Sequence, residues 1–249
     1  MTAQGASRSW RLRAPLALAL GAALWRSTGT ARAASDAADA LNPLNPLNPL
    51  RARVDASRLP APGTYKLSRI MAAPDGEVLH PSGQSTRLHR VLRGRLSVVS
   101  FIYSYCRDPE GCPRAWAVID AVHAELLRDR ALAGQAQLVS LSFDPSHDTP
   151  AQMRLIGGER ATDSRVRWHF LTTASVPALL PLLRGFGQDV SVETDARGRA
   201  TRTLNHMLKV FLVDESAQVR EIYSVATLDP QAIVNDLRTL QMELAAARS

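Results

Sequence analysis

The sequence predicts an α/β fold of three layers, with a central mixed sheet between helices. Residues 96–103 (LSVVSFIY) and 137–143 (QLVSLSF) are apolar and β-branched runs of the length of buried strands. Between them, residues 113–130 carry apolar side chains at a helical spacing, including Trp116 and Ile119. Buried strands that alternate with amphipathic helices are typical of a sheet covered on both faces.

The later elements extend this pattern. A helix is expected to begin at Thr149-Pro150, because threonine is a favoured N-cap residue and proline suits the first turn. The remaining expected elements are a helix over 176–186, a strand pair at 207–213 and 219–225, and a C-terminal helix over 229–247. This is the order of a thioredoxin-like fold, although periodicity alone does not separate it from other three-layer α/β folds.

An N-terminal hairpin extension is predicted before the first long strand. Residues 65–71 and 77–80 are short pieces of alternating apolar character, and Pro74-Asp75-Gly76 between them is a turn sequence.

The first 33 residues are typical of a signal peptide. Three arginines, Arg8, Arg11 and Arg13, precede a twelve-residue apolar run at 14–25, and Ala31-Arg32-Ala33 has the small-x-small pattern of a cleavage site. The run is shorter than the roughly 20 residues that span a bilayer. We therefore expect a periplasmic protein that is soluble after cleavage, with an uncleaved inner-membrane anchor as the alternative.

A proline-rich linker is expected over 34–62, where LNPLNPLNPL favours an extended spacer, and a folded domain over 63–249. The chain has 30 basic and 23 acidic residues and a formal charge of +7. Residues 1–33 contain five arginines and no acid, so cleavage would leave a charge of +2. A nucleic-acid-binding function therefore loses its main support, and no nucleic-acid partner is expected.

The two cysteines, Cys106 and Cys112, are the residues in the chain most suited to redox chemistry or metal binding. They lie where a buried strand ends and a helix begins, and Pro109 and Gly111 predict a loop that brings the sulfurs together. A thiol at a helix N-terminus is favoured as thiolate, which is both a redox nucleophile and a soft metal ligand. A structural disulfide is the alternative, but a bridge across so short a loop stabilises little.

Several segments resemble the Sco/SenC family of thioredoxin-like copper-binding proteins that assemble the CuA centre of cytochrome c oxidase. The resemblance covers about residues 60–245, and its most specific part is Asp144-Pro145, followed by Asp148-Thr149-Pro150. The other matching segments are Leu92-Arg93-Gly94-Arg95, the strand and helix around the cysteines, Trp168-His169-Phe170-Leu171-Thr172, and Asn205-His206 before 210–214.

The resemblance implies copper, as Cu(I) or Cu(II), held by Cys106, Cys112 and His206. It implies a copper metallochaperone or thiol-redox protein whose partner is a copper-receiving subunit of a respiratory oxidase. One alternative is a metal-free thiol-disulfide oxidoreductase, in which Cys106 and Cys112 are a catalytic redox pair that acts on a thiol-redox partner. The other is a binding module in which the two cysteines form only a structural disulfide.

Three features depart from the family or from thiol oxidoreductases. The cysteines are separated by five residues, where the family usually has three, and His206 follows Asn205 rather than an acidic residue. Residues 204–210 also contain no proline, whereas thioredoxin oxidoreductases carry a cis-proline just before the strand that faces their dithiol. The longer spacer predicts a loosened or re-tuned metal site.

Four other polar or aromatic residues are interpreted structurally. Asp144 is expected to end a strand and Asp148 to start a helix, rather than to form a catalytic carboxylate pair. Trp168 and His169 are expected to be packing and strand-end residues.

Overall fold

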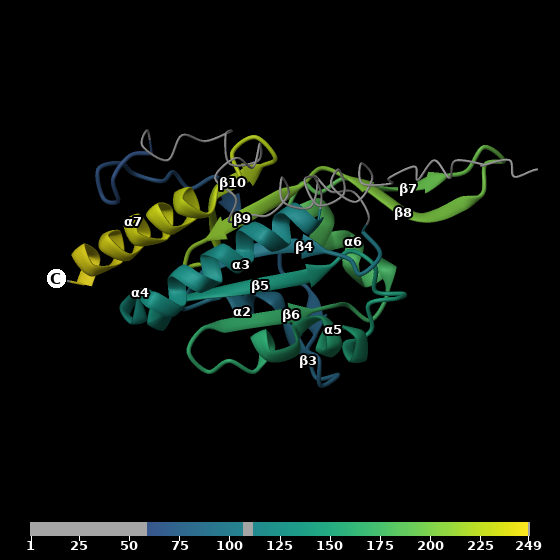
Figure 1. Ribbon diagram of the computed structural model, residues 1–249, viewed down its shortest axis with the longest axis horizontal. Coiled ribbons are helices and arrows are strands. Elements are labelled where there is room, and N and C mark those ends of the chain that lie inside the picture. Colours follow the sequence, from purple (N-terminus) through teal and green to yellow (C-terminus); the bar gives the residue numbers. More distant parts are fainter. Residues whose placement is uncertain (1–58, 107–111, 249) are drawn as a thin grey trace, which may run out of the picture. The chain divides into compact units, whose positions relative to one another are not determined.

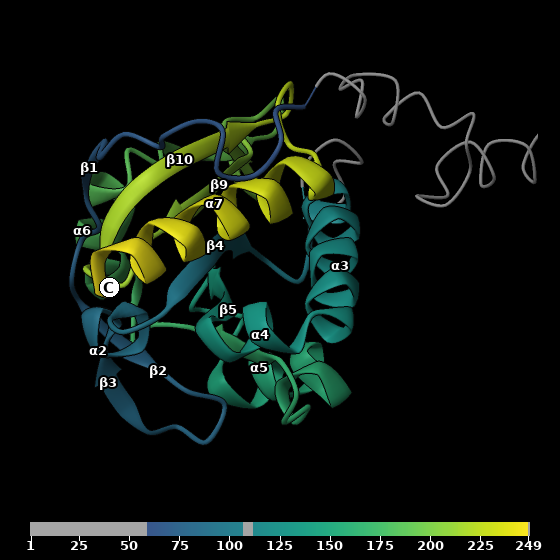
Figure 2. The same cartoon turned by 90° about the vertical axis from the view of Figure 1, so that its left-hand side faces the viewer.

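The computed structural model describes residues 59–106 and 112–248. The predicted signal peptide, most of the predicted linker, and the loop residues Pro109 and Gly111 lie outside the described residues. The core is a six-stranded sheet in the order β1-β10-β9-β4-β5-β6. Its strands are β1 (Met71–Ala72), β4 (Leu96–Ile102), β5 (Ala136–Ser142), β6 (Arg167–Leu171), β9 (Lys209–Val213) and β10 (Gln218–Ser224). Figure 1 labels β10 to β6, and Figure 2 labels β1.

The sheet is mixed, as predicted. Strands β4, β5 and β6 are parallel, while β9 is antiparallel to both β4 and β10. The parallel strands are joined by crossovers that contain helices α3 (Cys112–Arg128), α4 (Arg130–Gln135) and α5 (Pro150–Gly157), followed by a 3-10 turn at Gly158–Ala161. The carboxyl ends of β4 and β5 therefore lie at one edge of the molecule, and their amino ends lie at the other.

Helices cover both faces of the sheet. Alternate residues of β4 point to opposite faces, so Val98 and Ile102 pack with α3 and α7 (Pro230–Arg248), whereas Val99 and Phe101 pack with α2 (Leu88–Leu92) and α6 (Val176–Gly185). Figure 2 shows α3 and α7 side by side over the sheet. Among the described residues, no helix is both long and apolar enough to cross a membrane.

Helix starts follow the capping residues that the sequence contains. The hydroxyl of Thr149 accepts a hydrogen bond from the Gln152 N–H at 3.3 Å, with Pro150 in the first turn, as predicted. The Asp229 carboxylate accepts hydrogen bonds from the N–H groups of Gln231 and Ala232 at 2.9 and 3.0 Å before α7. These side chains satisfy donors that the first helical turn leaves free.

The N-terminal hairpin is present, but its strands differ from those predicted. Strand β2 (Glu77–Leu79) pairs with β3 (Ser85–Arg87), whereas Met71–Ala72 pairs with β10 at the edge of the main sheet. The proposed pairing of 65–71 with 77–80 was therefore wrong. The Asp75 carboxylate instead accepts a hydrogen bond from the His89 N–H at 2.9 Å and fixes the turn to the start of α2.

A second two-stranded ribbon, β7 (Val190–Thr194) with β8 (Ala200–His206), is not predicted by the sequence analysis. Its β7 residues are mostly exposed, so they lack the apolar alternation that marks a half-buried strand. The turn between the two strands is closed by Asp195, whose carboxylate accepts hydrogen bonds from the N–H groups of Arg197 and Arg199 at 2.8 and 3.0 Å. This ribbon positions His206.

Candidate metal centre

The two cysteines and His206 meet at the carboxyl end of β4. Cys106 follows the end of β4, Cys112 is the first residue of α3, and His206 is the last residue of β8. The two sulfurs and a ring nitrogen of His206 all lie within 4.8 Å of one another. The fold therefore brings together the two cysteines and the histidine that the family resemblance implied as ligands, from three separate segments.

The donor set fits a soft metal ion. A first-row metal with the bond lengths known for zinc, about 2.3 Å to sulfur and 2.0 Å to nitrogen, would hold three donors roughly 4 Å apart in a trigonal site. The donor atoms lie at most 4.8 Å apart, so each separation exceeds that value by less than 1 Å or not at all. Thiolate and imidazole ligands suit Cu(I), Cu(II) or zinc better than magnesium or calcium. Small side-chain movements would close the site around one ion.

The two cysteines differ in exposure, and the pKa of Cys112 is raised. Cys112 is 1% exposed, Cys106 is half-buried, and the Cys112 N–H donates a hydrogen bond to the Cys106 sulfur at 3.4 Å. The hydrogen bond with Cys106, burial and the charge of Cys106 raise the pKa of the Cys112 thiol. The prediction that the helix N-terminus favours thiolate is therefore wrong for Cys112, because burial and the neighbouring sulfur outweigh the helix N-terminus.

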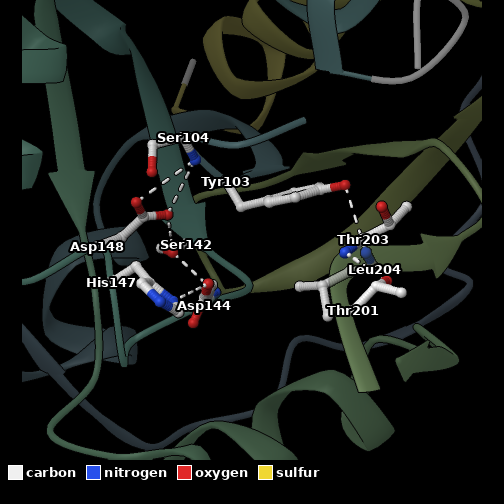
Figure 3. Close-up of polar contacts among 9 residues, drawn as sticks. All are labelled: Tyr103, Ser104, Ser142, Asp144, His147, Asp148, Thr201, Thr203 and Leu204. Carbon is white, nitrogen blue, oxygen red and sulfur yellow. Dashed lines mark hydrogen bonds and ion pairs between the residues drawn. The ribbon is translucent and has the colours of Figure 1, made fainter. Parts of the chain in front are cut away.

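Tyr103 links the cysteines to the β8 segment. Its hydroxyl oxygen accepts a hydrogen bond from the Leu204 N–H at 3.4 Å, two residues before His206 (Figure 3). Burial, together with the charge and hydrogen bond of Cys106, raises the pKa of Tyr103 to about 12. The phenol thus stays neutral and holds β8 beside the sulfurs.

Aromatic rings orient the His206 imidazole. The ring of Phe143 lies 4.4 Å from it, and the ring of Tyr103 lies 6.1 Å away in an edge-on arrangement. Nδ1 of His206 lies 3.4 Å from the Met207 carbonyl oxygen. Contacts of this kind restrict ring rotation, so the position of His206 depends on the residues that follow β4 and β5 as well as on β8.

Asp148 ties the cysteine segment to the end of β5. Its carboxylate is fully buried and accepts hydrogen bonds from the Ser142 hydroxyl at 2.6 Å and from the Ser104 N–H at 3.2 Å (Figure 3). Ser104 lies two residues before Cys106. The sequence pattern indicated only that Asp148 starts a helix, and it did not predict this positioning role. The only sequence feature that pointed to a role for Asp148 near the site was its position in the family-like segment from Asp144 to Pro150.

The other residues singled out in the sequence have structural roles in the fold. Nδ1 of His147 lies 2.6 Å from the Asp144 carboxylate, which is consistent with a local turn after β5. Trp168 is buried in the core, where its indole N–H donates to the Ser140 hydroxyl at 3.0 Å, as the packing interpretation predicted. His169 lies away from the metal centre, in a cavity at the amino end of the strands.

The two sulfurs also line a cavity of about 310 Å³. The other residues that line it are Ile102, Tyr103, Ser104, Pro113, Trp116, Gln152 and Ile156. Apolar walls of this kind limit water around the sulfurs and strengthen electrostatic interactions at the site.

Solved structures share this architecture. Apo Sco1 from Thermus thermophilus has a TM-score of 0.56 at 20% identity, covering 72% of this chain and 98% of that one. Bradyrhizobium japonicum ScoI with copper bound has a TM-score of 0.51 at 16% identity (70% and 98% covered), and yeast Sco1 with copper bound has 0.51 at 16% (71% and 90%). These likenesses confirm the predicted thioredoxin-like fold. A comparison with curated proteins gave no match.

The family model for SCO1/SenC matches residues 79–242, more than half of the chain, and this span contains both cysteines and His206. The chain belongs to the SCO1/SenC family.

Proposed function

We propose that this protein is an exported copper carrier that binds copper through Cys106, Cys112 and His206 and delivers it to a respiratory oxidase subunit, at a centre of the CuA type. The observation that supports this best is the convergence of two sulfurs and one imidazole nitrogen within 4.8 Å. Membership of the SCO1/SenC family supports the same function, as do two similar structures that are described as having copper bound. The signal-like N-terminus supports periplasmic delivery.

The protein's own groups suit uptake and release. Two thiolates and one imidazole give copper a soft, three-donor site. Because the pKa of Cys112 is raised, its thiol holds a proton before the metal arrives, and uptake at its sulfur displaces that proton. Asp148 and Tyr103 hold the segments that carry Cys106 and His206, so the donors are largely in place beforehand. Cargo exchange then requires movement of side chains rather than refolding.

A copper titration of the reduced full-length protein tests the proposal. We expect one copper ion per chain, with a thiolate-to-copper absorbance band and a change in tryptophan fluorescence, because Trp116 lines the same cavity as the sulfurs. The variant with both Cys106→Ser and Cys112→Ser is the control. The proposal fails if the wild-type protein takes up no more copper than this double variant.

A metal-free thiol-disulfide oxidoreductase is the second candidate, and the proximity of the two sulfurs supports it. In that reaction the two thiols would reduce a partner disulfide to two thiols and become a Cys106–Cys112 disulfide themselves. A protein that exchanges disulfides with a model substrate but binds no copper above the double variant would have this function instead.

A further inference from the structure

A second cavity, of about 290 Å³, lies at the amino end of the parallel strands. Six of the residues that line it carry basic side chains: His80, Arg90, Arg93, Arg95, Arg167 and His169. They come from the β2–β3 connection, from α2 and the turn after it, and from β6. We call this cavity the arginine pocket. The described residues that line it include no carboxylate.

The guanidinium groups of the arginine pocket have no ion-pair partner among the described residues. Arginines elsewhere in the fold do have one: Arg160 contacts Asp120 at 2.7 Å, and Arg220 contacts Asp214 at 3.1 Å. Within the pocket, Arg95 donates a hydrogen bond to the Gly134 carbonyl at 2.9 Å, which orients its side chain without neutralising it. Four like charges around one cavity are unfavourable unless an anion or solvent compensates them.

His80 and His169 supply the two imidazole rings of the arginine pocket. Their rings lie 6.0 Å apart, between the arginine-bearing segments. Burial, with the charges of His80, Arg167 and Arg95, lowers the pKa of His169 to about 4, and burial lowers that of His80. Both imidazoles are therefore neutral at pH 7, when each can donate one N–H or accept one hydrogen bond.

Arginine chemistry identifies the class of ligand. A guanidinium group is a planar fork of N–H donors that matches the oxygens of phosphate in pairs, and Arg is favoured wherever such recognition occurs. A single carboxylate presents two oxygens and one charge, which is too little for four arginines. We propose that the arginine pocket binds a phosphate group, either as a free phosphate or pyrophosphate or as part of a phospholipid headgroup.

The pocket is separate from the metal centre. Strand β4 begins at Leu96, beside the arginine pocket, and ends four residues before Cys106. A strand of seven residues spans roughly 20 Å, so about that distance separates the two sites. Ligand binding in the pocket is thus expected to be independent of copper, and the proposal does not rest on the proposed function.

Titration calorimetry of the full-length protein with inorganic phosphate and with pyrophosphate tests the proposal. We expect the Arg93→Gln, Arg167→Gln double variant to bind at least 10-fold more weakly, because both side chains are exposed at the pocket and their loss should not disturb the core. The Arg184→Gln, Arg197→Gln double variant is the matched control, since both side chains are exposed outside the pocket and it loses the same two charges, so it should leave binding unchanged. The Cys106→Ser, Cys112→Ser variant should also bind phosphate normally.

Vesicles distinguish the two sources of phosphate. Flotation with phosphatidylglycerol vesicles, against phosphatidylcholine vesicles at the same salt concentration, measures headgroup binding. The arginines of residues 1–33 are present in every variant, and the control variant loses the same number of charges, so the difference between the control and the pocket variant reports the pocket. Loss of binding in the pocket variant in either assay supports the proposal. Equal binding by wild type and pocket variant to phosphate, pyrophosphate and vesicles overturns it.

Discussion

The two ends of the parallel strands β4, β5 and β6 carry opposite chemistry. At the carboxyl end of β4, two sulfurs and one imidazole lie among aromatic and apolar side chains. At the amino end, four guanidinium groups surround a polar cavity. Sheets of this type commonly bind ligands outside the carboxyl ends of their strands, and the metal centre follows that rule. The arginine pocket does not, so its ligand must be attracted by side-chain charge.

The comparison predicts that one sheet can hold the candidate metal centre and the proposed phosphate site without coupling them. Each set of side chains comes from segments fixed by different contacts: Asp148 and Tyr103 at the carboxyl end, and Asp75 and the β2–β3 hairpin at the amino end. Variants at one end should therefore leave the other end unchanged.

The largest effect is expected from the cysteines. Cys106→Ser and Cys112→Ser should each lower copper affinity by more than about 1,000-fold, because a neutral hydroxyl is a poor replacement for thiolate as a ligand for Cu(I). Competition with a copper chelator of known affinity measures the loss. Phosphate binding should not change in either variant. Retention of tight copper binding by a single serine variant would contradict the three-donor site.

His206→Ala should weaken copper binding less, by roughly 10- to 100-fold, because the two thiolates alone can still hold Cu(I) in linear geometry. The absorbance spectrum of the copper complex should change, while the circular dichroism of the apo protein should not. His147→Ala is the matched control, because its ring nitrogen contacts Asp144 and it is not one of the three candidate ligands. Equal effects of the two substitutions would remove His206 from the site.

Asp148→Asn should loosen the metal centre without touching a ligand. The carboxamide accepts hydrogen bonds from Ser142 and Ser104 less strongly than the buried carboxylate, so the expected loss of stability is about 2–3 kcal/mol. Copper affinity should fall by a few-fold as the Cys106 segment becomes less ordered. Asp120→Asn is the control, because its ion pair with Arg160 is exposed and worth less than about 1 kcal/mol.

Chemical unfolding of the apo protein and copper competition measure these two effects of Asp148→Asn separately. A stability loss with unchanged copper affinity would mean that Asp148 supports the fold alone. The role of Asp148 would then be that of any buried hydrogen-bonding group.

The central part of the fold could be predicted from sequence because its signals are local. The strand at 96–102 is buried on both faces, so its apolar run predicted it to within two residues. The helix that begins at Pro150 was predicted equally well, because the hydroxyl of Thr149 caps it. The N-terminal hairpin was paired with the wrong strands. Short strands of two or three residues have too few side chains to specify a partner strand. Met71 therefore pairs with the edge of β10 rather than with residues 77–80.

The metal site was predictable in part for a similar reason. Cys106 and Cys112 stand out by residue type and by their place between strand and helix. His206 was singled out only by a family resemblance, because the exposed ribbon that carries it has no periodic apolar pattern. The arginine pocket was not predicted, although three of its four arginines lie within residues 90–95, because only tertiary packing brings that segment beside Arg167 and the two histidines.

The smallest effect is expected from His169, and its sign follows from the lowered pKa. Unfolded histidine takes up a proton near pH 6.5, whereas His169 in the folded protein remains neutral until the pH approaches about 4. Between these values the unfolded state binds more protons, so stability falls as the pH falls from about 6.5 toward 4. By pH 5 this one group should cost about 1–2 kcal/mol relative to pH 7.

His169→Gln removes the titration, so its unfolding free energy should fall less between pH 7 and pH 5 than that of the wild type. Denaturant unfolding at each pH measures the difference, and each protein is compared with its own value at pH 7, which cancels any packing change. Phosphate should reduce the penalty in the wild type, because a bound anion in the arginine pocket favours the protonated ring. Parallel stability curves for the two proteins would show that neither burial nor the charges of His80, Arg167 and Arg95 lower the pKa of His169. The contrast between the two ends of the sheet would then lose its electrostatic basis.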